Sequence, residues 1–126
     1  MFRLANMDVG LTPPIKYKPV TAGEAVVLGE ALVVTAGALT KCGPTVKPQY
    51  VAVGPNNAAG EVPVVQVQDY MTFETQLSAA GTELKIGDKL TLAADGLRVT
   101  ATTTGGVAEI VRLDGKAAGD CVLVKF

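Results

Sequence analysis

The sequence predicts a mainly β protein, a compact β-barrel or β-sandwich built from 126 residues. The first observation is the abundance of turn-forming residues, 14 glycines and 7 prolines, in a chain whose aromatic content is only 5%. The second is the alternation of apolar and polar side chains along residues 62–77, which is typical of a strand with one buried face. The third is that no segment combines helical apolar spacing with helix caps.

A near-repeat divides this β domain into two similar units. Residues 22–34 align with residues 80–92 at a constant offset of 58, and the similarity resumes near the end of each unit. A repeated unit of this size cannot bury its apolar face alone, so two units are expected to stack. The predicted units are residues 22–67 and 80–125.

Each predicted unit presents one apolar face, and the two faces are expected to pack against each other about a rough pseudo-twofold axis. The stretches around Val26 and Leu84 are expected to be strands. The pairs Gly29-Glu30 and Gly87-Asp88 are expected to form matching turns, in which glycine adopts a positive φ and the carboxylate accepts backbone N–H groups. This role in the turns explains why the acidic residues are present, so no catalytic role is needed for them. The faces comprise Val26, Leu28, Leu32 and Val34 in the first unit and Leu84, Ile86, Leu90 and Leu92 in the second.

Residues 1–20 are predicted to form an extended N-terminal arm outside the single β-rich domain of residues 21–126. Pro13, Pro14 and Pro19 interrupt helices and central strands, so they are expected to keep the arm out of the sheet. An arm with many apolar side chains is expected to dock on its own domain or on a neighbouring chain. The candidate attachment residues are Phe2, Leu4, Leu11, Ile15 and Tyr17.

Charge and residue content argue against several functions. The formal net charge is −1 and the cations form no run, so nucleic acid is not an expected partner. The sequence has no histidine, the commonest general base and metal ligand, and neither an enzyme nor a cofactor or metal site is expected. Cys42 and Cys121 lie outside any CxxC pair, and two buried free thiols are expected, with a disulfide as the alternative.

The N-terminal residues carry no long apolar core and no cleavage signature, and no stretch approaches about eighteen apolar residues. We therefore expect this protein to be made soluble inside the cell and to have no membrane partner. Its apolar content of 48% is high for so small a chain, which predicts that part of its surface is covered in a homo-oligomer.

The spacing of these features resembles that of small tailed-phage capsid decoration proteins, also called head-stabilising or cement proteins. The resemblance covers residues 19–126 and rests on Gly-acid turns followed by apolar strands, such as residues 29–33, 59–64 and 118–124, and on the strand at residues 51–54.

The resemblance implies a β-rich protein without enzymatic activity that assembles on the capsid exterior, commonly as a trimer, and binds the major capsid protein to clamp neighbouring capsomers. The alternative is a β-rich binding module of a virion tail or fibre that recognises a carbohydrate or cell-surface ligand. Three tyrosines and three phenylalanines are a small supply of aromatic residues for stacking on sugars.

Overall fold

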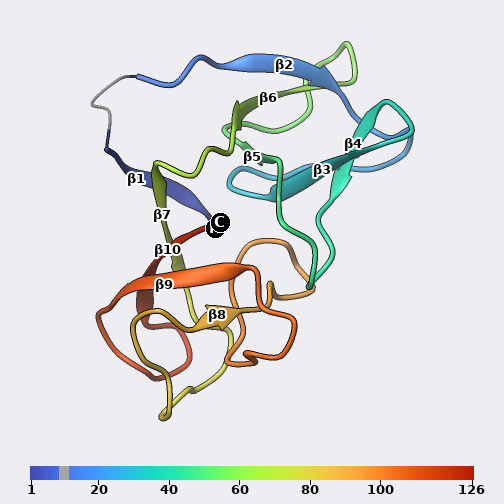
Figure 1. Cartoon of the computed structure of the whole chain (residues 1–126). Coiled ribbons are helices and arrows are strands. Elements are labelled where there is room, and N and C mark those ends of the chain that lie inside the picture. Colours follow the sequence, from blue (N-terminus) through green and yellow to red (C-terminus); the bar gives the residue numbers. More distant parts are fainter. Residues whose placement is uncertain (9–11) are drawn as a thin grey trace.

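The computed structural model describes residues 1–8 and 12–126 and shows two five-stranded antiparallel sheets (Figure 1). The described residues include no helix, and neither sheet is a closed barrel. The prediction of a mainly β protein is therefore confirmed, and of the two architectures left open by the sequence the structure is the sandwich-like one.

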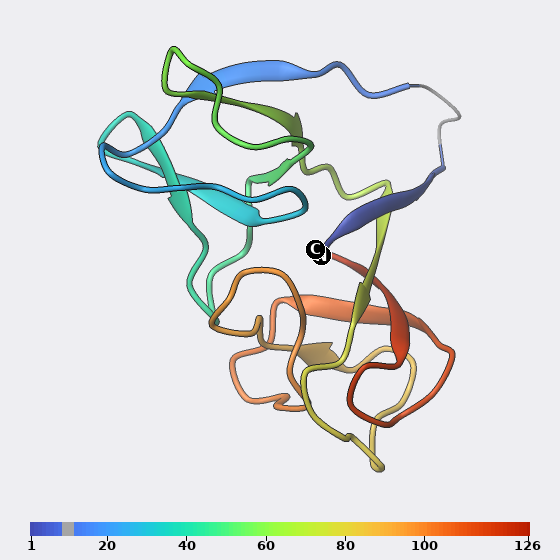
Figure 2. The same ribbon diagram turned by 180° about the vertical axis from the view of Figure 1, so that it is seen from behind.

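The first sheet lies in the upper part of Figure 1 and the second in the lower part. Figure 2 shows the molecule from behind, and in both views the two chain ends lie close together between the sheets. The first sheet has the order β2 (Lys16–Pro19), β6 (Glu61–Gln66), β5 (Tyr50–Ala52), β3 (Ala31–Thr35) and β4 (Ala38–Lys41). The second has the order β1 (Arg3–Met7), β7 (Met71–Gln76), β10 (Cys121–Lys125), β9 (Ala108–Leu113) and β8 (Lys89–Leu90).

Backbone hydrogen bonds recur in the two sheets at the offset of 58 seen in the sequence. The Gly29 N–H donates to the Ala52 carbonyl (2.8 Å), and the Gly87 N–H donates to the Ile110 carbonyl (2.9 Å). The N–H groups of Ala52 and Ile110 donate back to the acidic residue that follows each glycine, at 2.9 and 2.8 Å. The strand order β2-β6-β5-β3 thus corresponds to β7-β10-β9-β8. β2 and β7 precede residues 22 and 80, so each unit starts one strand earlier than the sequence alignment indicates.

The two Gly-acid turns have the same geometry. Gly29 and Gly87 adopt φ angles of 83° and 96°, which glycine tolerates because it has no Cβ. The carboxylate of Glu30 accepts the N–H of the residue three positions earlier at 3.0 Å, and the carboxylate of Asp88 does so at 2.9 Å. The predicted matching turns are therefore present.

The expectation that the stretches around Val26 and Leu84 are strands is wrong, because both are irregular. In the first stretch, side chains take the backbone donors that a sheet would use. The Val26 N–H donates to Asn56 Oδ1 (2.7 Å), and the next N–H donates to Glu30. Each stretch lies between two turns, which leaves too few residues to pair with a neighbouring strand.

The two predicted apolar faces do not pack against each other, because their residues divide between two clusters. Val26 and Leu32 belong to a small cluster within the first unit, together with Leu39 of β4. Leu84 and Leu90 belong to a larger cluster that includes the second sheet. That larger cluster also takes in Ala31, Val51 and Val65 from the first sheet, and these residues join the two sheets. Three of the predicted face residues are exposed instead, namely Leu28, Val34 and Ile86.

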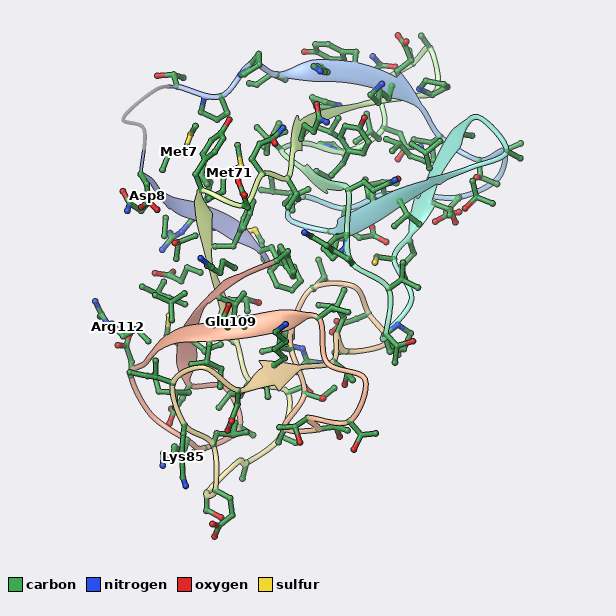
Figure 3. The ribbon with its side chains drawn as sticks, in the orientation of Figure 1. Met7, Asp8, Met71, Lys85, Glu109 and Arg112 are labelled. Carbon is green, nitrogen blue, oxygen red and sulfur yellow. The ribbon has the colours of Figure 1, made fainter. Side chains whose placement is uncertain are left out.

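The sequence predicts that prolines keep residues 1–20 out of the sheets, and this prediction is wrong. β1 pairs with β7, and Met7 and Met71 lie close together at this junction (Figure 3). β2 pairs with β6, and Pro19 is its last residue, where an edge strand accommodates proline because one side needs no donor. The first 20 residues thus supply an edge strand to each sheet.

A candidate apolar docking groove

An apolar groove of about 330 Å³ lies between β1, the segment leading into β2, and the face of the first sheet. Its inner wall includes Val51 and Val65, which are buried and belong to the cluster that joins the sheets. Its rim has large exposed aliphatic side chains that leave the groove open to a partner. These rim residues are Met1, Ile15, Leu28 and Val53, with exposed fractions of 43%, 58%, 50% and 38%.

Four separate segments contribute to this rim, and backbone hydrogen bonds outside the strands tie down three of them. The Phe2 N–H donates to the Gly29 carbonyl (2.9 Å), which ties the start of the chain to the turn that carries Leu28. The Met1 side chain fills the space over Gly29 that a Cβ would occupy. The Val53 N–H donates to the Pro63 carbonyl (2.9 Å) and extends the edge beyond β5. The groove is therefore held by backbone hydrogen bonds and not by loop side chains alone.

The predicted attachment residues are only partly brought together. Phe2, Leu4 and Ile15 line the groove, whereas Tyr17 is 59% exposed but does not line it. Leu11 lies outside the described residues. Phe2 itself is 2% exposed, and its ring centroid is 5.5 Å from that of Phe126. Phe2 is thus part of the protein's own core and supports the groove from within.

The sequence analysis missed Met1, Leu28 and Val53 as groove residues. Leu28 was assigned to a buried strand face, yet it sits beside the turn at Gly29 and points outward. Its counterpart in the second unit, Ile86, precedes the matching Gly87 turn and is 70% exposed. Leu28 and Ile86 both directly precede a glycine of positive φ, and this shared position is the signal that could have indicated that their side chains are exposed.

The few charged groups near the groove are engaged elsewhere or only partly solvated. Arg3 forms an ion pair with Glu74 of β7, across the junction of the two strands. Partial burial lowers the pKa of the Met1 amino group, and the nearby Asp95 carboxylate opposes this shift. An apolar partner surface would therefore meet few charges in this groove.

Glu30 directly follows Gly29, whose carbonyl accepts the Phe2 N–H. Its side chain is 2% exposed, and burial raises its carboxyl pKa although Val27 and Lys41 oppose the shift. Oε1 has no hydrogen-bond partner among the described residues, and the Lys41 ammonium lies 3.8 Å from it. The Glu30 carboxyl group does not line the groove.

The thiols show no reactive arrangement. Cys42 and Cys121 are both free, Cys42 buried and Cys121 half-buried. Burial raises the pKa of Cys42 to about 11, and its thiol lies 2.9 Å from the Val46 carbonyl.

Across the described parts of the chain, no group of three or more Cys, Asp or Glu side chains is placed to hold a metal ion. No helix long and apolar enough to span a membrane occurs in residues 1–8 and 12–126.

Comparison with protein-family models finds no matching family, and a search of curated proteins finds no matching relative.

Proposed function

We propose that this protein is a structural component of a phage virion that binds the outer surface of the capsid and stabilises contacts between capsomers. The major capsid protein is the partner in this proposal, and the groove between β1 and the first sheet is the attachment site. The protein acts by adhesion, without turnover of a substrate.

The groove is the observation that carries this proposal. It brings four exposed aliphatic side chains together beside the first sheet, whereas surface aliphatic residues usually occur singly. An adhesive protein needs such a preformed apolar surface because binding then costs little ordering entropy. The resemblance of residues 19–126 to decoration proteins supports the same assignment.

A homo-oligomer, with a trimer favoured, is part of the proposal. Apolar residues away from the groove, such as Val34, Val46 and Val111, are 41%, 47% and 39% exposed and are available to contacts between copies. Light scattering of the purified protein over a range of concentrations tests this part, and a trimer is the expected mass. A monomer at every concentration would contradict it.

Co-sedimentation with expanded capsid shells tests the attachment site. The shells are assembled from the major capsid protein encoded in the same genome, and saturable binding of the wild-type protein is expected. The Leu28→Glu variant places a charge at the groove rim, and it should bind at least about tenfold more weakly because an apolar interface would bury that charge.

The matched control is Ile86→Glu, which introduces the same charge in the corresponding turn of the second unit, outside the groove. Both side chains are exposed and both precede a positive-φ glycine, so the two variants should be equally well folded. Ile86→Glu should retain wild-type binding. Equal loss in both variants, or wild-type binding by Leu28→Glu, would refute the groove as the attachment site.

A further inference from the structure

The first and second units differ at the open side of their first strand. β2 and β7 occupy the same position in their sheets, since the Val20 N–H donates to the Gly60 carbonyl and the Leu77 N–H to the Asp120 carbonyl, at 3.2 and 3.0 Å. In the second unit, β1 covers the start of β7. In the first unit, β6 pairs along β2, and just beyond the end of β2 the Thr21 N–H donates to the Leu39 carbonyl of β4 (2.9 Å), so the open side among the described strands is the start of β2. Figures 1 and 2 both show β2 along the outer rim of the described structure.

The open side of β2 offers unused backbone groups. The Val20 N–H points toward β6, and successive residues of a strand point their backbone groups to opposite sides. The N–H and carbonyl groups of Tyr17 and Ile15 therefore face away from β6. Their side chains are 59% and 58% exposed and lie on the same face, where Ile15 lines the groove.

The opposite face of β2 is positively charged. Lys16 donates to Gln66 Oε1 at 3.1 Å, and the Lys18 ammonium lies 5.3 Å above the centre of the Tyr50 ring. Neither lysine forms an ion pair with a residue in the described ranges. At the covered edge in the second unit, by contrast, Glu74 of β7 pairs with Arg3 of β1.

We propose that the open edge of β2 binds an extended segment of another protein, in which acidic side chains alternate with apolar ones. The segment adds as a sixth strand to the first sheet, as β1 does at the corresponding edge of the second. Its acidic residues face Lys16 and Lys18, and its apolar residues cover Ile15 and Tyr17. This inference goes beyond the proposed function, because it identifies a second binding surface whatever the groove binds.

Charge complementarity argues against a second copy of this chain as the occupant. Two β2 strands paired with each other would bring lysine close to lysine, which destabilises a strand pair. β1 of another copy contains Arg3 and no acidic residue. A partner with acidic residues at every second position is the segment that the edge fits.

Fluorescence anisotropy with two labelled hexapeptides tests the inference, one alternating glutamate with valine and one alternating lysine with valine. The wild-type protein should bind the glutamate peptide roughly tenfold more tightly than the lysine peptide, from the sum of two cross-strand charge pairs. The double variant Lys16→Glu/Lys18→Glu should reverse this preference. The control Lys85→Glu/Lys116→Glu changes net charge equally at exposed sites in the second unit and should keep the wild-type preference.

A backbone variant separates strand addition from simple charge attraction. Tyr17→Pro removes an N–H that faces the open side and leaves the pairing with β6 intact, so the fold should survive with a cooperative unfolding transition. Binding of the glutamate peptide should be lost. The inference is overturned if the wild type binds neither peptide, if Lys16→Glu/Lys18→Glu keeps the control's preference, or if a folded Tyr17→Pro variant binds normally.

Discussion

Replacing Phe2 with alanine removes an aromatic ring from the contact that joins the two chain ends. Phe2 is 2% exposed, its ring lies 5.5 Å from that of Phe126, and Phe126 lies 5.6 Å from Phe73 of β7. Truncation of a buried phenylalanine to alanine costs about 3–5 kcal/mol, through lost burial and the cavity left behind. A domain of this size has a free energy of unfolding of about 5–15 kcal/mol, so Phe2→Ala should remove a large part of it.

Urea unfolding followed by circular dichroism measures this loss. With a slope of about 1–3 kcal/mol per molar urea, the midpoint should fall by roughly 1–5 M. The control is Ile15→Ala, which shortens an exposed side chain of the same N-terminal segment and should cost less than about 1 kcal/mol. A Phe2→Ala midpoint within error of the Ile15→Ala midpoint would refute the placement of Phe2 in the core. Such a result would favour the detachable arm that the sequence analysis expected.

Three further perturbations test other features of the fold. Burial raises the pKa of the Glu30 carboxyl group, so the folded state favours its neutral form. The free energy of unfolding of the wild type should therefore fall relative to that of Glu30→Gln as pH rises through that pKa, measured as urea midpoints between about pH 4 and 8. A constant difference between the two proteins over this range would contradict the prediction. Iodoacetamide at about pH 8 should modify Cys121 faster than Cys42, whose buried thiol has a pKa of about 11, and mass spectrometry would show the reverse order if Cys42 were accessible. Gly106→Ala should lower the free energy of unfolding by more than about 2 kcal/mol, because the new Cβ collides with the backbone of β8. The control Gly43→Ala should lower it by less than about 1 kcal/mol. Equal urea midpoints for the two variants would disprove the close approach of Gly106 to β8.

The parts of the fold that the sequence predicts are those with a local physical cause. Alternation along residues 62–77 predicts strands because side chains of a strand point to opposite faces; β7 lies within that range, and β6 begins one residue before it. The Gly29 and Gly87 turns follow from residue type, since a positive φ favours glycine and the next carboxylate can accept a nearby N–H.

The errors arise where tertiary contacts decide. Short apolar stretches around Val26 and Leu84 have the composition of strands, but side-chain acceptors and turns take the place of sheet pairing. Pro19 ends an edge strand, whereas the prolines were expected to keep residues 1–20 out of the sheet. The groove was only partly predictable, since Leu28 and Val53 come from segments that meet Ile15 only in the folded chain.

We propose that the groove between β1 and the first sheet faces the capsid. The most direct test is a cryo-electron microscopy map of shells decorated with the wild-type protein, at a resolution that shows side chains. In this map, Ile15, Leu28 and Val53 should contact the major capsid protein. A map in which the protein binds the shell through another face, with these three side chains open to solvent, would contradict it.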